Sequence, residues 1–104
     1  MGTAITYIPI TPHEREERMP TISIFYGIMI KMYWDEHAPP HFHAEYAGIE
    51  AVVNIRTLEI TQGKLPRGAA ILVKEWAMQH RDELMEDWKL CEKLQTPNKI
   101  APME

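Results

Sequence analysis

The stretch that decides the fold is HFHAEYAGIEAVVN, which occupies residues 41–54. Side chains alternate between the two faces of a strand, and both halves of this stretch alternate in polarity around Ala47-Gly48. A two-residue turn there produces three apolar cross-strand pairs: Phe42 with Val53, Ala44 with Ala51, and Tyr46 with Ile49. The sequence therefore predicts an antiparallel hairpin with one apolar face and a self-consistent register.

The other face of this hairpin carries polar side chains that a hydrophobic core does not require. His41, His43 and Glu45 share that face of the first strand. The preceding loop holds His37 and two adjacent prolines, which restrict the backbone and fix His37 relative to His41. This histidine-rich face is the candidate functional site.

Metal binding is the first chemistry that these residue types indicate. Neutral imidazole is a good ligand for transition metals such as zinc. Histidines two apart on a strand project to the same side, so the predicted ligands are His37, His41, His43 and Glu45. The competing interpretation is a polar outer face whose histidines form hydrogen bonds to side chains or to the backbone.

Acid–base catalysis is the second interpretation of the same histidines. His41 and His43 would transfer protons, and Arg56 would stabilise an anionic transition state, as in metal-free cleavage of RNA. The formal net charge of −4 disfavours nucleic acid as a partner, because such binding depends on neutralising phosphates.

The segments flanking the hairpin predict further strands. Residues 21–34 read as one long strand whose core face carries Ile22, Ile24, Tyr26, Ile28, Ile30, Met32 and Trp34. Gly27 indicates a bend, and such a bend would split the strand into a hairpin-like pair. Residues 58–60 predict one more short strand.

From Pro66 onward the hydrophobic period becomes helical, with an apolar stripe that runs to Cys91. An unbroken helix over residues 66–94 would be roughly 43 Å long, which exceeds the width of a domain of this size. We therefore expect a break near His80, with Asp82 capping a second helix. The polar outer face of that helix is acidic and carries Asp82, Glu83, Glu86, Asp87 and Glu92. The predicted fold is α+β: an antiparallel sheet of three or four strands with one or two C-terminal helices packed on one face.

The length of 104 residues predicts a single domain over residues 19–104, preceded by a flexible leader or edge strand over residues 1–18. One cysteine excludes an internal disulfide and is typical of a reducing compartment, so we expect a cytoplasmic protein. No apolar run reaches the length of a membrane span, and no signal peptide is recognisable.

The chain resembles a small bacterial family known as domain of unknown function 4160. Residues 19–28, the Pro-Pro-His-Phe-His-Ala-Glu-Tyr run of residues 39–46, and Gly63-Lys64-Leu65-Pro66 carry the resemblance, with the Trp76 to Trp88 region. The resemblance implies a component of a toxin–antitoxin pair, bound to a small protein encoded nearby or forming a homodimer. It transfers no catalytic residue to this chain.

Overall fold

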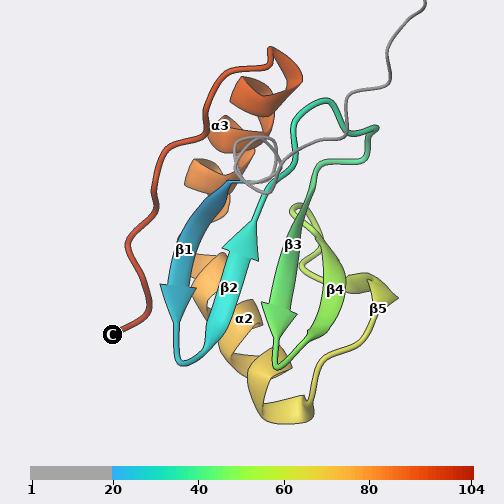
Figure 1. Ribbon diagram of the computed structural model, residues 1–104, viewed down its shortest axis with the longest axis vertical. Helices are drawn as coiled ribbons and strands as arrows, with labels where there is room; N and C mark the ends of the chain where they lie inside the picture. Colours follow the sequence, from blue (N-terminus) through green and yellow to red (C-terminus); the bar gives the residue numbers. More distant parts are fainter. Residues whose placement is uncertain (1–19) are drawn as a thin grey trace, which may run out of the picture.

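The computed structural model describes residues 20–104 and shows a five-stranded antiparallel sheet with two helices behind one face (Figure 1). The sheet order follows the chain, β1-β2-β3-β4-β5, so each strand pairs with its sequence neighbour. The elements are β1 Thr21–Phe25, β2 Ile28–Lys31, β3 His41–Tyr46, β4 Ile49–Asn54, β5 Ile60–Gly63, α2 Arg67–Gln79 and α3 Arg81–Glu92. The predicted α+β class, with two C-terminal helices, is confirmed.

The number of strands differs from the prediction of three or four. The segment 21–34 folds back on itself at Tyr26 and Gly27, whose φ angles of 50° and 78° form a tight turn. It therefore contributes two paired strands, as the alternative reading of Gly27 anticipated. The strand expected over residues 58–60 lies at Ile60–Gly63 instead and forms the fifth member of the sheet.

A register shift between Thr21 and Ser23 changes which β1 side chains face the core. Ser23 pairs with Ile30 and is buried, whereas Ile24 is 58% exposed. The expectation that Ile24 and Tyr26 belong to the core face was wrong, because an extra residue in one strand inverts the alternation beyond it. Tyr26 lies in the turn and is also exposed.

The β3–β4 hairpin has the predicted register along its whole length. Phe42 pairs with Val53, and the remaining pairs follow without a slip as far as Tyr46 with Ile49. Ala47 and Gly48 both have positive φ, at 51° and 81°, as a two-residue primed turn requires. The imidazoles of β3 are therefore held on the face opposite Phe42.

The core lies between the sheet and the helices. Trp76 of α2 is the largest of the fully buried side chains, with its ring centroid 5.2 Å from that of Phe25 and 6.3 Å from that of Phe42. The predicted break is confirmed at His80, between α2 and α3. The proposed Asp82 cap was wrong: the cap position falls at His80, no side chain caps the helix, and Asp82 lies in the first turn.

The C-terminal segment lies along β1 (Figure 1). The Ile100 N–H donates to the Ile22 carbonyl at 2.9 Å, and the Ile100 side chain is buried. Asp87 holds this segment through its Oδ1, which accepts from the Asn98 N–H at 2.8 Å. Asp87 was predicted to lie on the acidic outer face of α3, but it is only 1% exposed.

Within residues 20–104 no helix is both long enough and apolar enough to cross a membrane. The predicted leader over residues 1–18 lies outside the described part of the chain.

The buried carboxyl of Asp87 should make the stability of the protein depend on pH. Burial raises the pKa of this carboxyl from 3.8 to about 6. The native state therefore binds the Asp87 proton more tightly than the unfolded chain, so this residue contributes most to stability below pH 4, and the contribution is lost as the pH rises to about 6. Asp87→Asn keeps an acceptor for Asn98 and should be more stable than wild type by about 2–3 kcal/mol at pH 7, but not at pH 4.

Urea unfolding of both proteins between pH 4 and pH 7 measures this difference. A constant difference across that range would show that the Asp87 carboxyl titrates normally in the native state.

Candidate functional site

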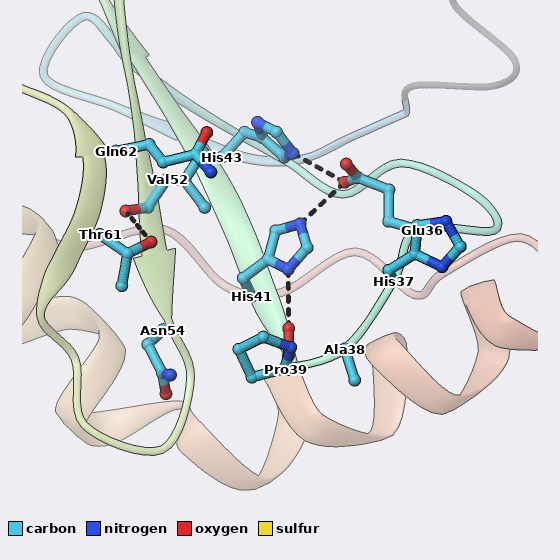
Figure 2. A pocket seen from close by; sticks show the side chains of 10 residues that line it. All are labelled: Glu36, His37, Ala38, Pro39, His41, His43, Val52, Asn54, Thr61 and Gln62. Carbon is cyan, nitrogen blue, oxygen red and sulfur yellow. Dashed lines mark hydrogen bonds and ion pairs between the residues drawn. The ribbon is translucent and has the colours of Figure 1, made fainter.

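The loop between β2 and β3 places a carboxylate over the histidine face of the sheet (Figure 2). This loop, residues 32–40, is fastened at both ends. The Asp35 N–H donates to the Cys91 carbonyl of α3 at 3.3 Å, and the Pro40 carbonyl accepts from the Ile55 N–H at 3.0 Å. Between these attachments Glu36 points back toward β3.

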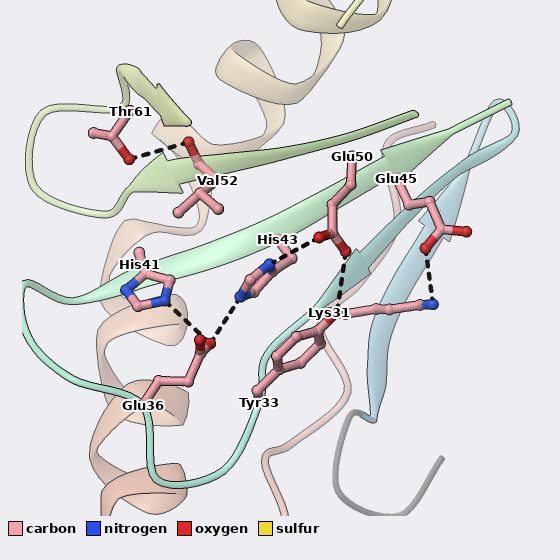
Figure 3. Close-up of polar contacts among 9 residues, drawn as sticks. All are labelled: Lys31, Tyr33, Glu36, His41, His43, Glu45, Glu50, Val52 and Thr61. Atoms are coloured by element: carbon pink, nitrogen blue, oxygen red, sulfur yellow. Dashed lines mark hydrogen bonds and ion pairs between the residues drawn. The ribbon is translucent and has the colours of Figure 1, made fainter. Parts of the chain in front are cut away.

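A single oxygen of Glu36 contacts two imidazoles (Figure 3). Glu36 Oε1 lies 2.7 Å from Nε2 of His43 and 3.1 Å from Nε2 of His41. Ligand atoms of these three residues all lie within 4.8 Å of one another. Three groups that can bind a transition metal thus converge on one point.

The other ring nitrogen of His41 determines what can lie between His41 and Glu36. Nδ1 is 2.8 Å from the Pro39 carbonyl oxygen, which only accepts, so Nδ1 carries a proton. In a neutral His41, Nε2 is then unprotonated, and its lone pair faces the Glu36 carboxylate. Two acceptors at 3.1 Å require a proton or a metal ion between them.

His43 is enclosed by a second set of partners. Its ring stacks on that of Tyr33, with centroids 4.0 Å apart and planes 13° apart, and the residue is 6% exposed. Its Nδ1 lies 3.6 Å from Glu50 Oε1, and the Tyr33 hydroxyl donates to Glu50 Oε2 at 3.0 Å. Burial, followed by the bond to Glu50, raises the pKa of the Tyr33 hydroxyl above its usual range, so it remains a donor.

A cavity of about 300 Å³ adjoins the three converging residues. Asn54 of β4 and Thr61 and Gln62 of β5 form its far wall (Figure 2). The lining residues include no lysine and no arginine. Within residues 20–104 the cavity therefore has no fixed cation of its own, and its wall combines polar and apolar side chains.

The structure brings only part of the predicted site together. His41 and His43 converge as expected, whereas His37 lines the cavity but is not part of the converging group. Glu45 turns away from it and pairs with Lys31 at 3.0 Å. Arg56 is exposed and does not line the cavity.

Glu36 is the member of the converging group that sequence reasoning missed. It lies in an irregular loop, where no repeating pattern in the sequence predicts the direction of a side chain. The sequence did contain a signal that Glu50 needs a partner, because the predicted register sets it directly opposite Glu45. Like charges in opposite positions destabilise a sheet unless each has a partner. The structure supplies those partners: Lys31 for Glu45, and Tyr33 with His43 for Glu50.

The converging group fits a divalent transition metal after a small adjustment. Ligand atoms around tetrahedral zinc lie about 2.0–2.1 Å from the ion, hence about 3.3 Å from each other. The distances from Glu36 to the imidazoles are somewhat shorter, and the ligand atoms of the two histidines lie within 4.8 Å of each other, so the side chains would adjust by roughly half an ångström or more. Glu36 lies in a loop with its side chain 27% exposed, which permits this movement.

One family model matches residues 27–89, and its description reads Domain of unknown function (DUF4160). The match covers the second strand of the first hairpin, the complete histidine face and most of both helices. No curated protein and no solved structure matches the chain.

The shared contact at Glu36 predicts a stability cost without any metal. In the presence of a chelator, Glu36→Ala should lower the free energy of unfolding by about 1–3 kcal/mol, because the buried Nε2 of His43 loses its partner. Glu45→Ala is the control, since its partly exposed pair with Lys31 contributes less than about 1 kcal/mol. Equal costs in urea unfolding would contradict this account.

Proposed function

The chain belongs to the DUF4160 family, whose description assigns no activity, and we propose that the protein binds a divalent transition metal at its histidine face. The proposed ligands are Glu36 Oε1, His41 Nε2 and His43 Nε2. Two imidazoles and one carboxylate are a common ligand set for catalytic zinc and for non-haem iron.

The observation that carries this proposal is the shared oxygen of Glu36. One carboxylate oxygen faces two imidazole nitrogens, and His41 donates its Nδ1 proton to the Pro39 carbonyl. Metal-binding histidines usually donate their second ring N–H in this way, which fixes the tautomer and leaves the other nitrogen free to bind the ion. His41 therefore has the orientation of a ligand before any ion is present.

The number of ligands favours a reactive centre over a structural one. Structural zinc sites have four protein ligands, whereas three leave a position for water or substrate. Here the adjoining cavity of about 300 Å³ provides space for such a molecule. An ion so placed polarises a bound carbonyl or lowers the pKa of a bound water.

Metal-free cleavage of RNA remains a weaker prediction. It requires a cation near the two histidines to stabilise the transition state. Arg56 was the proposed cation, and among residues 20–104 neither it nor any other arginine or lysine lines the cavity. The net charge of −4 also disfavours an RNA partner.

A toxin–antitoxin role remains a separate prediction that rests on the family resemblance. The exposed face of α3 carries Asp82, Glu83, Glu86 and Glu92, which suits a basic partner protein. This prediction concerns the helical side of the molecule, so it is compatible with a metal at the sheet.

The metal site predicts a specific pattern among histidine variants. Protein purified without a histidine tag and titrated with Zn²⁺ should bind roughly one ion per chain. His41→Ala and His43→Ala should each weaken binding by at least about 100-fold, since a ligand is lost. His37→Ala is the matched control: it removes a histidine from the same cavity but outside the converging group, and should bind as wild type does.

Isothermal titration and elemental analysis measure both stoichiometry and affinity. Absence of tight binding in the wild type would refute the metal site, and loss of binding in His37→Ala would refute this choice of ligands.

The partner hypothesis predicts that the protein co-purifies with the product of a neighbouring gene. Charge reversal on the outer face of α3, with Glu83→Lys and Glu86→Lys, should weaken that complex while leaving Zn²⁺ binding unchanged. A protein that purifies without a partner and has no effect on growth, alone or with its neighbour, would contradict the hypothesis.

A further inference from the structure

The partners of His43 form an ordered chain that ends on a tyrosine. Figure 3 shows His43 between two carboxylates, with Glu36 on its Nε2 side and Glu50 on its Nδ1 side. Tyr33 contacts both members of the second pair, because its ring stacks on His43 and its hydroxyl donates to Glu50. These contacts hold the His43 ring in one plane and one orientation.

We propose that Glu50 and Tyr33 are positioning residues that orient His43 as a metal ligand, an inference that rests on the proposed metal site. Glu50 accepts the Nδ1 proton of His43, which leaves Nε2 as the lone pair that faces the ion. Tyr33 holds Glu50 by its second oxygen and covers the ring from above. Neither residue touches the ion.

One unsatisfied atom supports this assignment. His43 Nδ1 is buried and has no hydrogen-bond partner, although Glu50 Oε1 lies only 3.6 Å away. Nε2 meanwhile forms a short contact of 2.7 Å with Glu36. An ion between Nε2 and Glu36 would separate these two groups, and any part of that separation taken up by the imidazole would bring Nδ1 closer to Glu50.

The two sides of the site also differ in how the histidines are supported. His41 donates its Nδ1 proton to a neutral backbone carbonyl, that of Pro39. His43 would have a carboxylate in the same role once its Nδ1 contact with Glu50, now 3.6 Å, closes to hydrogen-bond length, and a carboxylate raises the basicity of the imidazole more than a neutral carbonyl does.

The experiment compares Zn²⁺ affinity in five proteins and uses the direct cross-strand neighbour of Glu50 as its control. Glu50→Ala should weaken binding by about 10–100-fold, the usual effect of removing an outer-shell carboxylate. Glu45→Ala removes the same charge from the opposite position of the same hairpin, but its carboxylate pairs with Lys31. It should stay within about twofold of wild type, which excludes a general charge effect.

Tyr33→Phe keeps the stacked ring and removes only the hydroxyl, so it should weaken binding by less than about tenfold. Because Tyr33 is proposed to act through Glu50, the double variant with Glu50→Ala should bind no more weakly than Glu50→Ala alone. Independent, multiplicative effects would overturn the proposed chain of contacts.

A spectroscopic readout separates positioning from mere stability. In the Zn²⁺-loaded wild type, proton–nitrogen NMR correlations should show His43 protonated on Nδ1 and bound through Nε2, with the Nδ1 proton lost to fast solvent exchange in Glu50→Ala. Coordination through Nδ1, or equal Zn²⁺ affinity in wild type and Glu50→Ala, would overturn the inference while leaving the metal site intact. Failure of the wild type to bind Zn²⁺ would refute both.

Discussion

The two-residue period of β3 is the constraint on which both the core and the site depend. Phe42 and Ala44 are fully buried on one face, so the strand cannot slip by one residue without moving them into solvent. The same register fixes His41 and His43 on the opposite face, where the pleat keeps their rings on one side. Packing energy in the core therefore holds the two imidazoles in place, and the site does not need its own interactions to define their spacing.

Two carboxylates and little positive charge surround His43, which is the electrostatic setting of the proposed metal site. Glu36 and Glu50 lie on its two sides, and Lys31, the lysine of the neighbouring strand, is engaged by Glu45. The residues that line the cavity add no positive side chain. A buried imidazole between two carboxylates is stable when protons or an ion balance the negative charge. The arrangement is thus held by hydrogen bonds in the metal-free protein and retains the donor geometry that an ion uses.

The sequence predicts the structure best where one repeat of polar and apolar residues determines both faces of a strand or helix. The complete register of the β3–β4 hairpin and the helix break at His80 followed from alternation and length alone. Ile24 was misplaced because a bulge leaves no trace in composition, and it inverts the alternation after it. Glu36 escaped prediction for a related reason: an irregular loop has no phase, and only the contacts at Asp35 and Pro40 determine where it points. The histidines of the site were therefore predictable, but their shared carboxylate was not.

The construction of the core bears on what the proposed ion would do. A structural metal holds together a domain that cannot bury enough apolar surface, and such domains unfold without it. Here the sheet and helices enclose a continuous apolar cluster around Trp76, and one of its members, Trp88 of α3, has its ring centroid 5.0 Å from that of His41. The site also supplies three ligands from one strand and one loop, which leaves it open on the cavity side. An ion bound there would add little stability to a core that is already complete. Its role would therefore depend on the open coordination position, which can bind water or substrate.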